Sequence, residues 1–215
     1  MFIIIMKIIS LGGVGGCIIT QGLDCAGLYE PRGPYSWLIA SQSFVIDTFL
    51  HPNNFFDFDD ETQYMEHENK TVHLRHKNRN AVIIHDFETD INIELVKSKY
   101  NRRFQRLNDN LINNEPVLLI RVTEQNKQQL PEWENYYNVE RDNFQKWCEF
   151  RKYLEEQFNK PFFLLIITFN KTEYEENIKY QSDKVLINYL SQENNNLNIE
   201  NIANIFLETY HNLTS

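Results

Sequence analysis

The feature that most constrains the fold is a series of strongly apolar runs, separated by stretches with helical periodicity. Each run is continuously hydrophobic rather than alternating, which is typical of strands covered on both faces, as in a parallel sheet. The four clearest runs span residues 2–11, 81–87, 116–122 and 161–169, and a weaker fifth spans 184–190. These runs predict a mainly parallel sheet whose strands include residues 7–10, 82–85, 117–121 and 163–168.

Helical patterns lie between the apolar runs, because apolar side chains there recur with a period near 3.6 residues. The expected helices cover residues 17–28, 41–50, 94–112, 141–158 and 199–210. Alternating strands and helices are the signature of α/β folds with right-handed crossovers. We therefore predict an α/β fold with a mainly parallel central sheet and flanking helices, in a single domain over residues 1–215. Within it, we expect an extension at residues 1–5 and loop excursions at 59–80 and 122–140.

The composition excludes several classes of function. The net charge of -9 argues against general nucleic-acid binding, which is typical of proteins with an excess of basic residues. No run approaches the roughly 20 apolar residues that a membrane-spanning helix needs. The three cysteines are an odd number at unpatterned spacing, which is typical of a reducing setting rather than of a secreted disulfide framework. We expect a cytoplasmic protein without a membrane span, and the oligomeric state stays open.

Four of the seven glycines fall within residues 12–16. They do not complete a dinucleotide-binding motif, because Ile18 stands in place of the third glycine, and no Lys-Ser/Thr pair completes a P-loop. The glycine cluster is therefore either a tight turn or a loop that positions Cys17, the first residue of the expected helix, as a nucleophile. A helix N-terminus favours a thiolate. The backbone amides of Gly15 and Gly16 would bind substrate beside it.

A nucleophilic cysteine needs a base that accepts its proton, and His85 is the candidate. This residue lies near the end of the run at 81–87, where open α/β sheets hold their sites. The third group, which would orient the imidazole, is left open between Asp86, Asn80, Asp90 and a backbone carbonyl. The remaining histidines lack the ligand spacing of a metal site, so we expect neither a metal nor another cofactor.

A dense basic stretch covers residues 97–107 in an otherwise acidic chain. Its cations recur at three- and four-residue steps and include Arg102 and Arg103. Such a stretch is either a solvated helix face or a site where paired guanidinium groups recognise a phosphate or carboxylate. Arg121 ends another apolar run and is expected at the same rim of the sheet as His85.

The chain resembles, over residues 6–125, a family of papain-like cysteine peptidases found in bacteria and large DNA viruses. The motifs that carry the resemblance are "IISLGG" followed by Cys17, "GPYSWL", "IIHDF", "KYNRRFQRL" and "VLLIRV". Cys17 comes two residues later than the family's cysteine, as a two-residue insertion in the loop would explain. Ser36 stands where the family has an aspartate. The resemblance implies a papain-like peptidase whose matching residues are Cys17, His85, Asp86, Arg102, Arg103 and Arg121, and we expect Trp37 beside the site.

These observations together predict a hydrolase that cleaves a peptide or amide bond through a Cys17–His85 pair and a thioester. One alternative is a transferase that holds a phosphorylated or nucleotide-activated substrate with Arg102, Arg103, Arg106 and Arg121. Another is a catalytically inactive binding module. The expected partner is accordingly a peptide, an amide or a small phosphorylated substrate.

Overall fold

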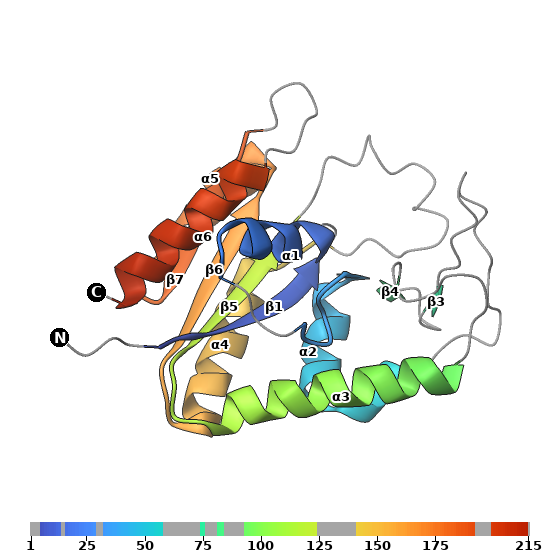
Figure 1. Ribbon diagram of the computed structural model, residues 1–215. Helices are drawn as coiled ribbons and strands as arrows, with labels where there is room; N and C mark the ends of the chain where they lie inside the picture. The colour runs from blue at the N-terminus through green and yellow to red at the C-terminus, as the bar shows by residue number, and fades with distance from the viewer. Residues whose placement is uncertain are drawn as a thin grey trace, which may run out of the picture.

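A four-stranded parallel sheet forms the centre of the protein, in the order β1-β5-β6-β7 (Figure 1). The computed structural model describes residues 5–13, 16–28, 32–57, 74–75, 81–83, 93–123, 141–191 and 199–214. The four strands are β1 (Lys7–Gly13), β5 (Val117–Val122), β6 (Phe162–Thr168) and β7 (Val185–Tyr189). The sheet confirms the predicted α/β fold, and the weaker fifth run supplies β7.

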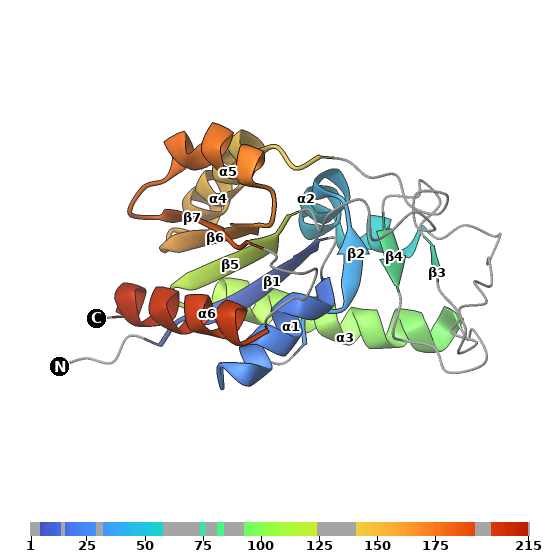
Figure 2. The same cartoon turned by 90° about the horizontal axis from the view of Figure 1, so that it is seen from above.

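Helices cover both faces of this sheet, which explains why its strands are mostly apolar on both faces. Figure 2 shows α1 and α6 on one side of the sheet, with α4 and α5 on the other. In β5, Leu118 joins a core that contains Phe206 of α6, whereas Leu119 joins a second core that contains Trp147 of α4. The helices are α1 (Gly16–Cys25), α2 (Gln42–Leu50), α3 (Ile93–Ile112), α4 (Phe144–Phe158), α5 (Lys171–Asn177) and α6 (Ile199–Thr214).

One predicted strand belongs to a different sheet. The strand β4 (Ala81–Ile83) pairs antiparallel with β2 (Leu38–Ala40) and with β3 (Leu74–Arg75), so the prediction that residues 82–85 run in the parallel sheet is wrong. All three residues of β4 are buried. Continuous hydrophobicity therefore predicted the burial of this strand correctly. It could not predict which strand would pair with β4, or whether the pair would be parallel or antiparallel.

The predicted helices are present, and most differences lie at their ends. The helix α4 begins at Phe144 rather than at residue 141, because the side chain of Asn143 accepts a hydrogen bond from the Lys146 N–H at 3.1 Å and caps the first turn. Helix α5 was not predicted, since its sequence KTEYEEN carries little apolar periodicity. Two short 3₁₀ helices, Pro52–Phe56 and Ile178–Tyr180, complete the elements described.

Candidate functional site

The turn between β1 and α1 requires glycine. Gly12 has φ +64° and Gly13 has φ +134°, a region that L side chains rarely adopt. A Cβ atom on Gly13 would lie 2.0 Å from the carbonyl oxygen of Val122, and one on Gly12 would lie 3.1 Å from that of Leu38. The register between β1 and β5 also shifts between Ser10 and Gly13. The first two glycines of the cluster are thus required by the backbone itself.

Cys17 is the second residue of α1, and its side chain is partly buried. Burial raises the pKa of its thiol to about 11, and a backbone hydrogen bond only partly offsets this effect. Burial thus opposes the thiolate that the helix N-terminus is expected to favour at Cys17. The thiol is protonated at neutral pH and needs a base to react.

The other residues of the predicted nucleophile site are only partly described. His85, Asp86 and Gly15 lie outside the described residues. The strand that precedes His85 in the sequence is β4, whose last residue Ile83 pairs with Leu38. Since the Leu38 carbonyl approaches Gly12, β4 ends close to the β1–α1 turn.

Trp37 lies next to the groove described below and has φ 68°, which places its backbone in the left-handed region. Its side chain is partly buried, and the guanidinium carbon of Arg32 lies 5.1 Å from the centre of its ring. A guanidinium over an aromatic face is attracted by the ring quadrupole. Trp37 therefore packs against Arg32, which none of the predicted motifs contains.

Arg121 does not lie on an open rim, contrary to the prediction. Arg121 is buried, and its guanidinium donates to both carboxylate oxygens of Asp142 and to the carbonyl of Leu11 at 3.0 Å. The Trp147 ring lies beneath it, with the guanidinium carbon 5.2 Å from the ring centre. Arg121 thus links β5, β1 and the residue two positions before α4. The guanidinium is buried because it pairs with the carboxylate of Asp142, 21 residues away in the sequence. No local sequence pattern predicts such a pair.

Arg102 and Arg103 line a surface groove of about 610 Å³, which we call the arginine groove. Arg102 is exposed, whereas Arg103 is 2% exposed and its guanidinium carbon lies 4.6 Å from the centre of the Tyr100 ring. The groove is lined by Arg32, Lys99, Arg102, Arg103, Gln105 and Arg106. Arg121 does not line this groove, so it does not share a site with Arg102 and Arg103.

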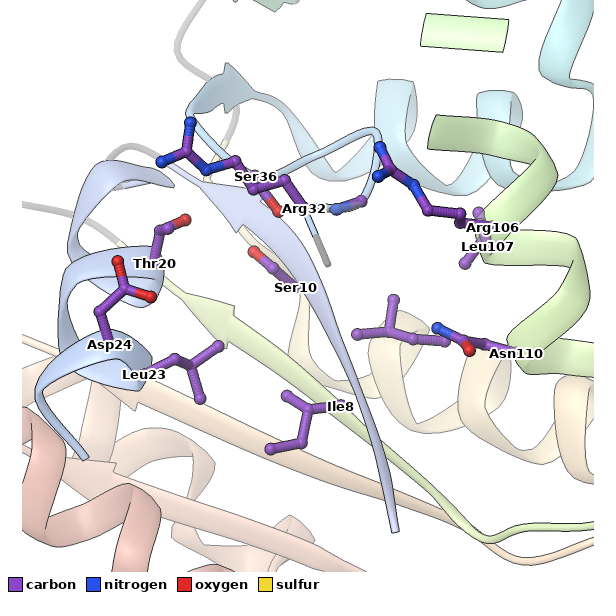
Figure 3. Close-up of a pocket in the computed structure, with 12 residues that line it drawn as sticks. Ile8, Ser10, Thr20, Leu23, Asp24, Arg32, Ser36, Arg106, Leu107 and Asn110 are labelled. Atoms are coloured by element: carbon purple, nitrogen blue, oxygen red, sulfur yellow. Dashed lines mark hydrogen bonds between the residues drawn. The ribbon is translucent and has the colours of Figure 1, made fainter. Parts of the chain in front are cut away.

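A small hollow of about 30 Å³ adjoins the arginine groove and shares Arg32 and Arg106 with it (Figure 3). We call it the inner hollow. In Figure 3, β1 passes between α1 on one side and α3 on the other, with the hollow between them. Its other polar side chains include Ser10, Thr20, Asp24 and Ser36. None of these was predicted, although Thr20 follows Cys17 by three residues and therefore lies on the neighbouring surface of α1.

Comparisons with family models, with curated proteins and with solved structures find no match to this chain. Within the described ranges, no helix is both long and apolar enough to cross a membrane. The same part of the chain holds no group of three or more His, Cys, Asp and Glu side chains that could bind a metal ion.

Proposed function

We propose that this protein is a cysteine-dependent hydrolase of peptide or amide bonds, with Cys17 as the nucleophile and His85 as the base. The observation that carries the proposal is the position of Cys17. It is the second residue of α1, it follows the glycine turn at the carboxyl end of β1, and its side chain is partly exposed. A substrate carbonyl can therefore reach a thiol that the backbone holds at a helix N-terminus.

The raised pKa of Cys17 makes a proton acceptor necessary for attack. In the proposed reaction the His85 imidazole takes the thiol proton while the sulfur bonds to the substrate carbonyl carbon. The C–N bond then breaks as the imidazolium returns that proton to the leaving amine, and a thioester remains on Cys17. Water, deprotonated by the same imidazole, hydrolyses the thioester to a carboxylic acid and restores the thiol.

The start of α1 also supports the proposal because it offers hydrogen-bond donors. The first N–H groups of an α-helix have no carbonyl partner within the helix. The amide of Gly16 belongs to this first turn. Donors of this kind stabilise the negative oxygen that develops when a nucleophile attacks a carbonyl. Glycine at position 16 leaves no side chain to block that approach.

The position of β4 supports the choice of His85. Ile83, the last residue of β4, lies opposite Leu38, and the Leu38 carbonyl borders the turn at Gly12. His85 follows Ile83 by two residues, and Asp86 is a candidate for orienting its imidazole. Two residues of chain span at most about 7 Å, so the chain itself keeps His85 within that distance of the end of β4.

The decisive experiment measures hydrolysis of a mixture of fluorogenic peptide amides and labelling by peptidyl acyloxymethyl ketones at pH 7. We expect the wild type to cleave amides and to be labelled at Cys17. Cys17→Ser and His85→Ala should each lose at least about 100-fold in both readouts. Asp86→Asn should reduce turnover without preventing the labelling.

Cys25→Ser is the matched control, because Cys25 belongs to the same helix and is exposed. It should retain wild-type hydrolysis and wild-type labelling of Cys17. Hydrolysis that survives in Cys17→Ser, or labelling of Cys17 that does not depend on His85, would contradict the proposal. Circular dichroism and thermal melting confirm that each variant is folded.

A further inference from the structure

We propose that the arginine groove and the adjoining inner hollow bind the phosphoryl group of a small phosphorylated ligand. This proposal does not depend on the chemistry of Cys17. It rests on three observations, all made on the described residues: the guanidinium groups of Arg32, Arg102 and Arg106 have no carboxylate partner there, the buried hydroxyl of Thr20 has no hydrogen-bond partner, and the groove lining includes no acidic side chain.

Three guanidinium groups of the groove, those of Arg32, Arg102 and Arg106, differ from those of three arginines elsewhere in the described part of the chain. Elsewhere, Arg121, Arg141 and Arg151 each have a carboxylate oxygen within 3.2 Å. Among the described residues, Arg32, Arg102 and Arg106 have no carboxylate within ion-pair distance. In a chain with a net charge of -9, carboxylates are abundant, yet these three positive groups have no ion-pair partner in the described part of the chain. An anionic ligand would supply the missing partner.

The spacing on α3 explains how the groove is built. Lys99, Arg102 and Arg106 recur at three- and four-residue steps and therefore share one face of the helix. Like charges at this spacing destabilise a helix by a few tenths of a kcal/mol per pair. Arg32 approaches from the segment before β2 and packs on Trp37. Two separate segments thus bring guanidinium groups to the same groove.

The inner hollow adds the hydroxyl groups of Ser10, Thr20 and Ser36. Thr20 is 7% exposed, and its Oγ1 has no hydrogen-bond partner among the described residues. The oxygens of Ser10 and Ser36 accept hydrogen bonds from the N–H groups of Gly12 and Gly33, at 3.3 and 3.1 Å. Each serine hydroxyl still carries a proton that it can donate. A buried hydroxyl without a partner is costly, which indicates that a ligand or water completes its hydrogen bonds.

The size and charge of the site favour a phosphoryl group. The hollow of about 30 Å³ accepts about one oxygen atom or one water, so the phosphorus itself would lie in the groove. Three guanidinium groups carry more charge than one carboxylate can neutralise, whereas a phosphate dianion presents three oxygens for planar N–H donors. Asp24 also lines the hollow and would accept from a hydroxyl or amine of the same ligand. The groove volume of about 610 Å³ suits a small molecule.

Isothermal titration calorimetry with inorganic pyrophosphate and inorganic phosphate tests the proposal. We expect the wild type to bind pyrophosphate with a stoichiometry of one at 150 mM NaCl. Arg32→Gln and Arg106→Gln should each weaken binding by about tenfold or more, as loss of a charged hydrogen bond does. Arg141→Gln makes the same charge change at an exposed arginine outside the groove, and it should stay within about twofold of the wild type.

Thr20 provides a second, independent variant pair. Thr20→Val keeps the shape of the side chain and removes the hydroxyl, so it should weaken pyrophosphate binding about threefold or more, whereas Thr20→Ser should retain it. Because Oγ1 has no partner, Thr20→Val should also melt at the same temperature as the unliganded wild type or higher. A lower melting temperature with unchanged binding would show a purely structural hydroxyl and would overturn this part.

Several outcomes overturn the proposal. The proposal fails if the wild type does not bind pyrophosphate, or if it binds acetate as tightly as pyrophosphate. It also fails if Arg141→Gln weakens pyrophosphate binding as much as Arg106→Gln does. Displacement of pyrophosphate by a single-stranded oligonucleotide of higher affinity would show a nucleic-acid surface instead. Cys17→Ser should bind pyrophosphate as the wild type does, so a failure of this site and a failure of the proposed hydrolysis can be told apart.

Discussion

The guanidinium of Arg121 donates two hydrogen bonds to the carboxylate of Asp142, from Nε to Oδ2 at 2.6 Å and from Nη2 to Oδ1 at 2.8 Å. Both side chains are almost fully buried, with exposed fractions of 2% and 3%. Trp147 Nε1 donates to the same carboxylate at 3.1 Å. An ion pair in this setting holds β5 against the segment that leads into α4.

Replacement of Asp142 by Asn should destabilise the protein by about 3 to 5 kcal/mol, because it leaves the buried charge of Arg121 without compensation. Urea unfolding followed by tryptophan fluorescence measures this change. Glu176→Gln, which removes the exposed partner of Arg141, should cost less than about 1 kcal/mol. A similar cost for the two variants would contradict the structural role of the buried pair.

Gly13→Ala should cost at least about 3 kcal/mol, because it combines a strained φ with a contact of 2.0 Å to the Val122 carbonyl. Gly27→Ala is the matched control. Gly27 also has a positive φ, of +66°, but a Cβ atom there meets nothing within 4 Å, so its cost should be only about 1 to 2 kcal/mol. Thermal melting of both variants checks the difference, and equal losses would contradict the close approach of β1 and β5.

The stability of the protein should fall as the pH rises from about 9 to about 11, in part because of Cys17. Burial raises the pKa of this thiol from its usual value of 9.0 to about 11. The contribution is fully present below pH 9, and it disappears as the unfolded chain loses the proton before the folded one does. The wild type should therefore lose more stability over this interval than Cys17→Ala. Parallel urea titrations at pH 8, 9, 10 and 11 make the comparison, and identical profiles would contradict it.

Lys160 should stabilise the end of α3, which carries the arginine groove. Its Nζ donates to the carbonyl oxygens of Asn110 and Asn113 at 2.8 and 2.9 Å. Lys160→Met would leave those carbonyls without this donor and should cost about 1 to 3 kcal/mol. Hydrogen exchange at residues 107–113 should accelerate, while exchange in α4 should change little. Unchanged protection at the end of α3 would show that these bonds contribute nothing.

The site could be predicted only in part. The glycine turn and Cys17 were accessible to prediction because they are adjacent in the sequence and their chemistry depends on local backbone geometry. The protonation state of Cys17 could not be predicted, since it depends on the burial of the thiol, which the tertiary structure decides. Arg102 and Arg103 were predicted as a basic face, but Arg32 and Thr20 belong to other elements and carry no motif that joins them to α3.

The sequence by itself determined the strands of the parallel sheet and the longer helices, though not β2, β3 or α5, because hydrophobic periodicity records how much of each segment faces water. It therefore predicted β1, β5, β6 and β7 and the five longest helices. Only the tertiary structure decided that β4 pairs with β2 instead of entering the parallel sheet, and that Arg121 meets Asp142. Strand partners and buried ion pairs join residues far apart in the chain, and their choice depends on competition among all possible neighbours, which no local pattern encodes.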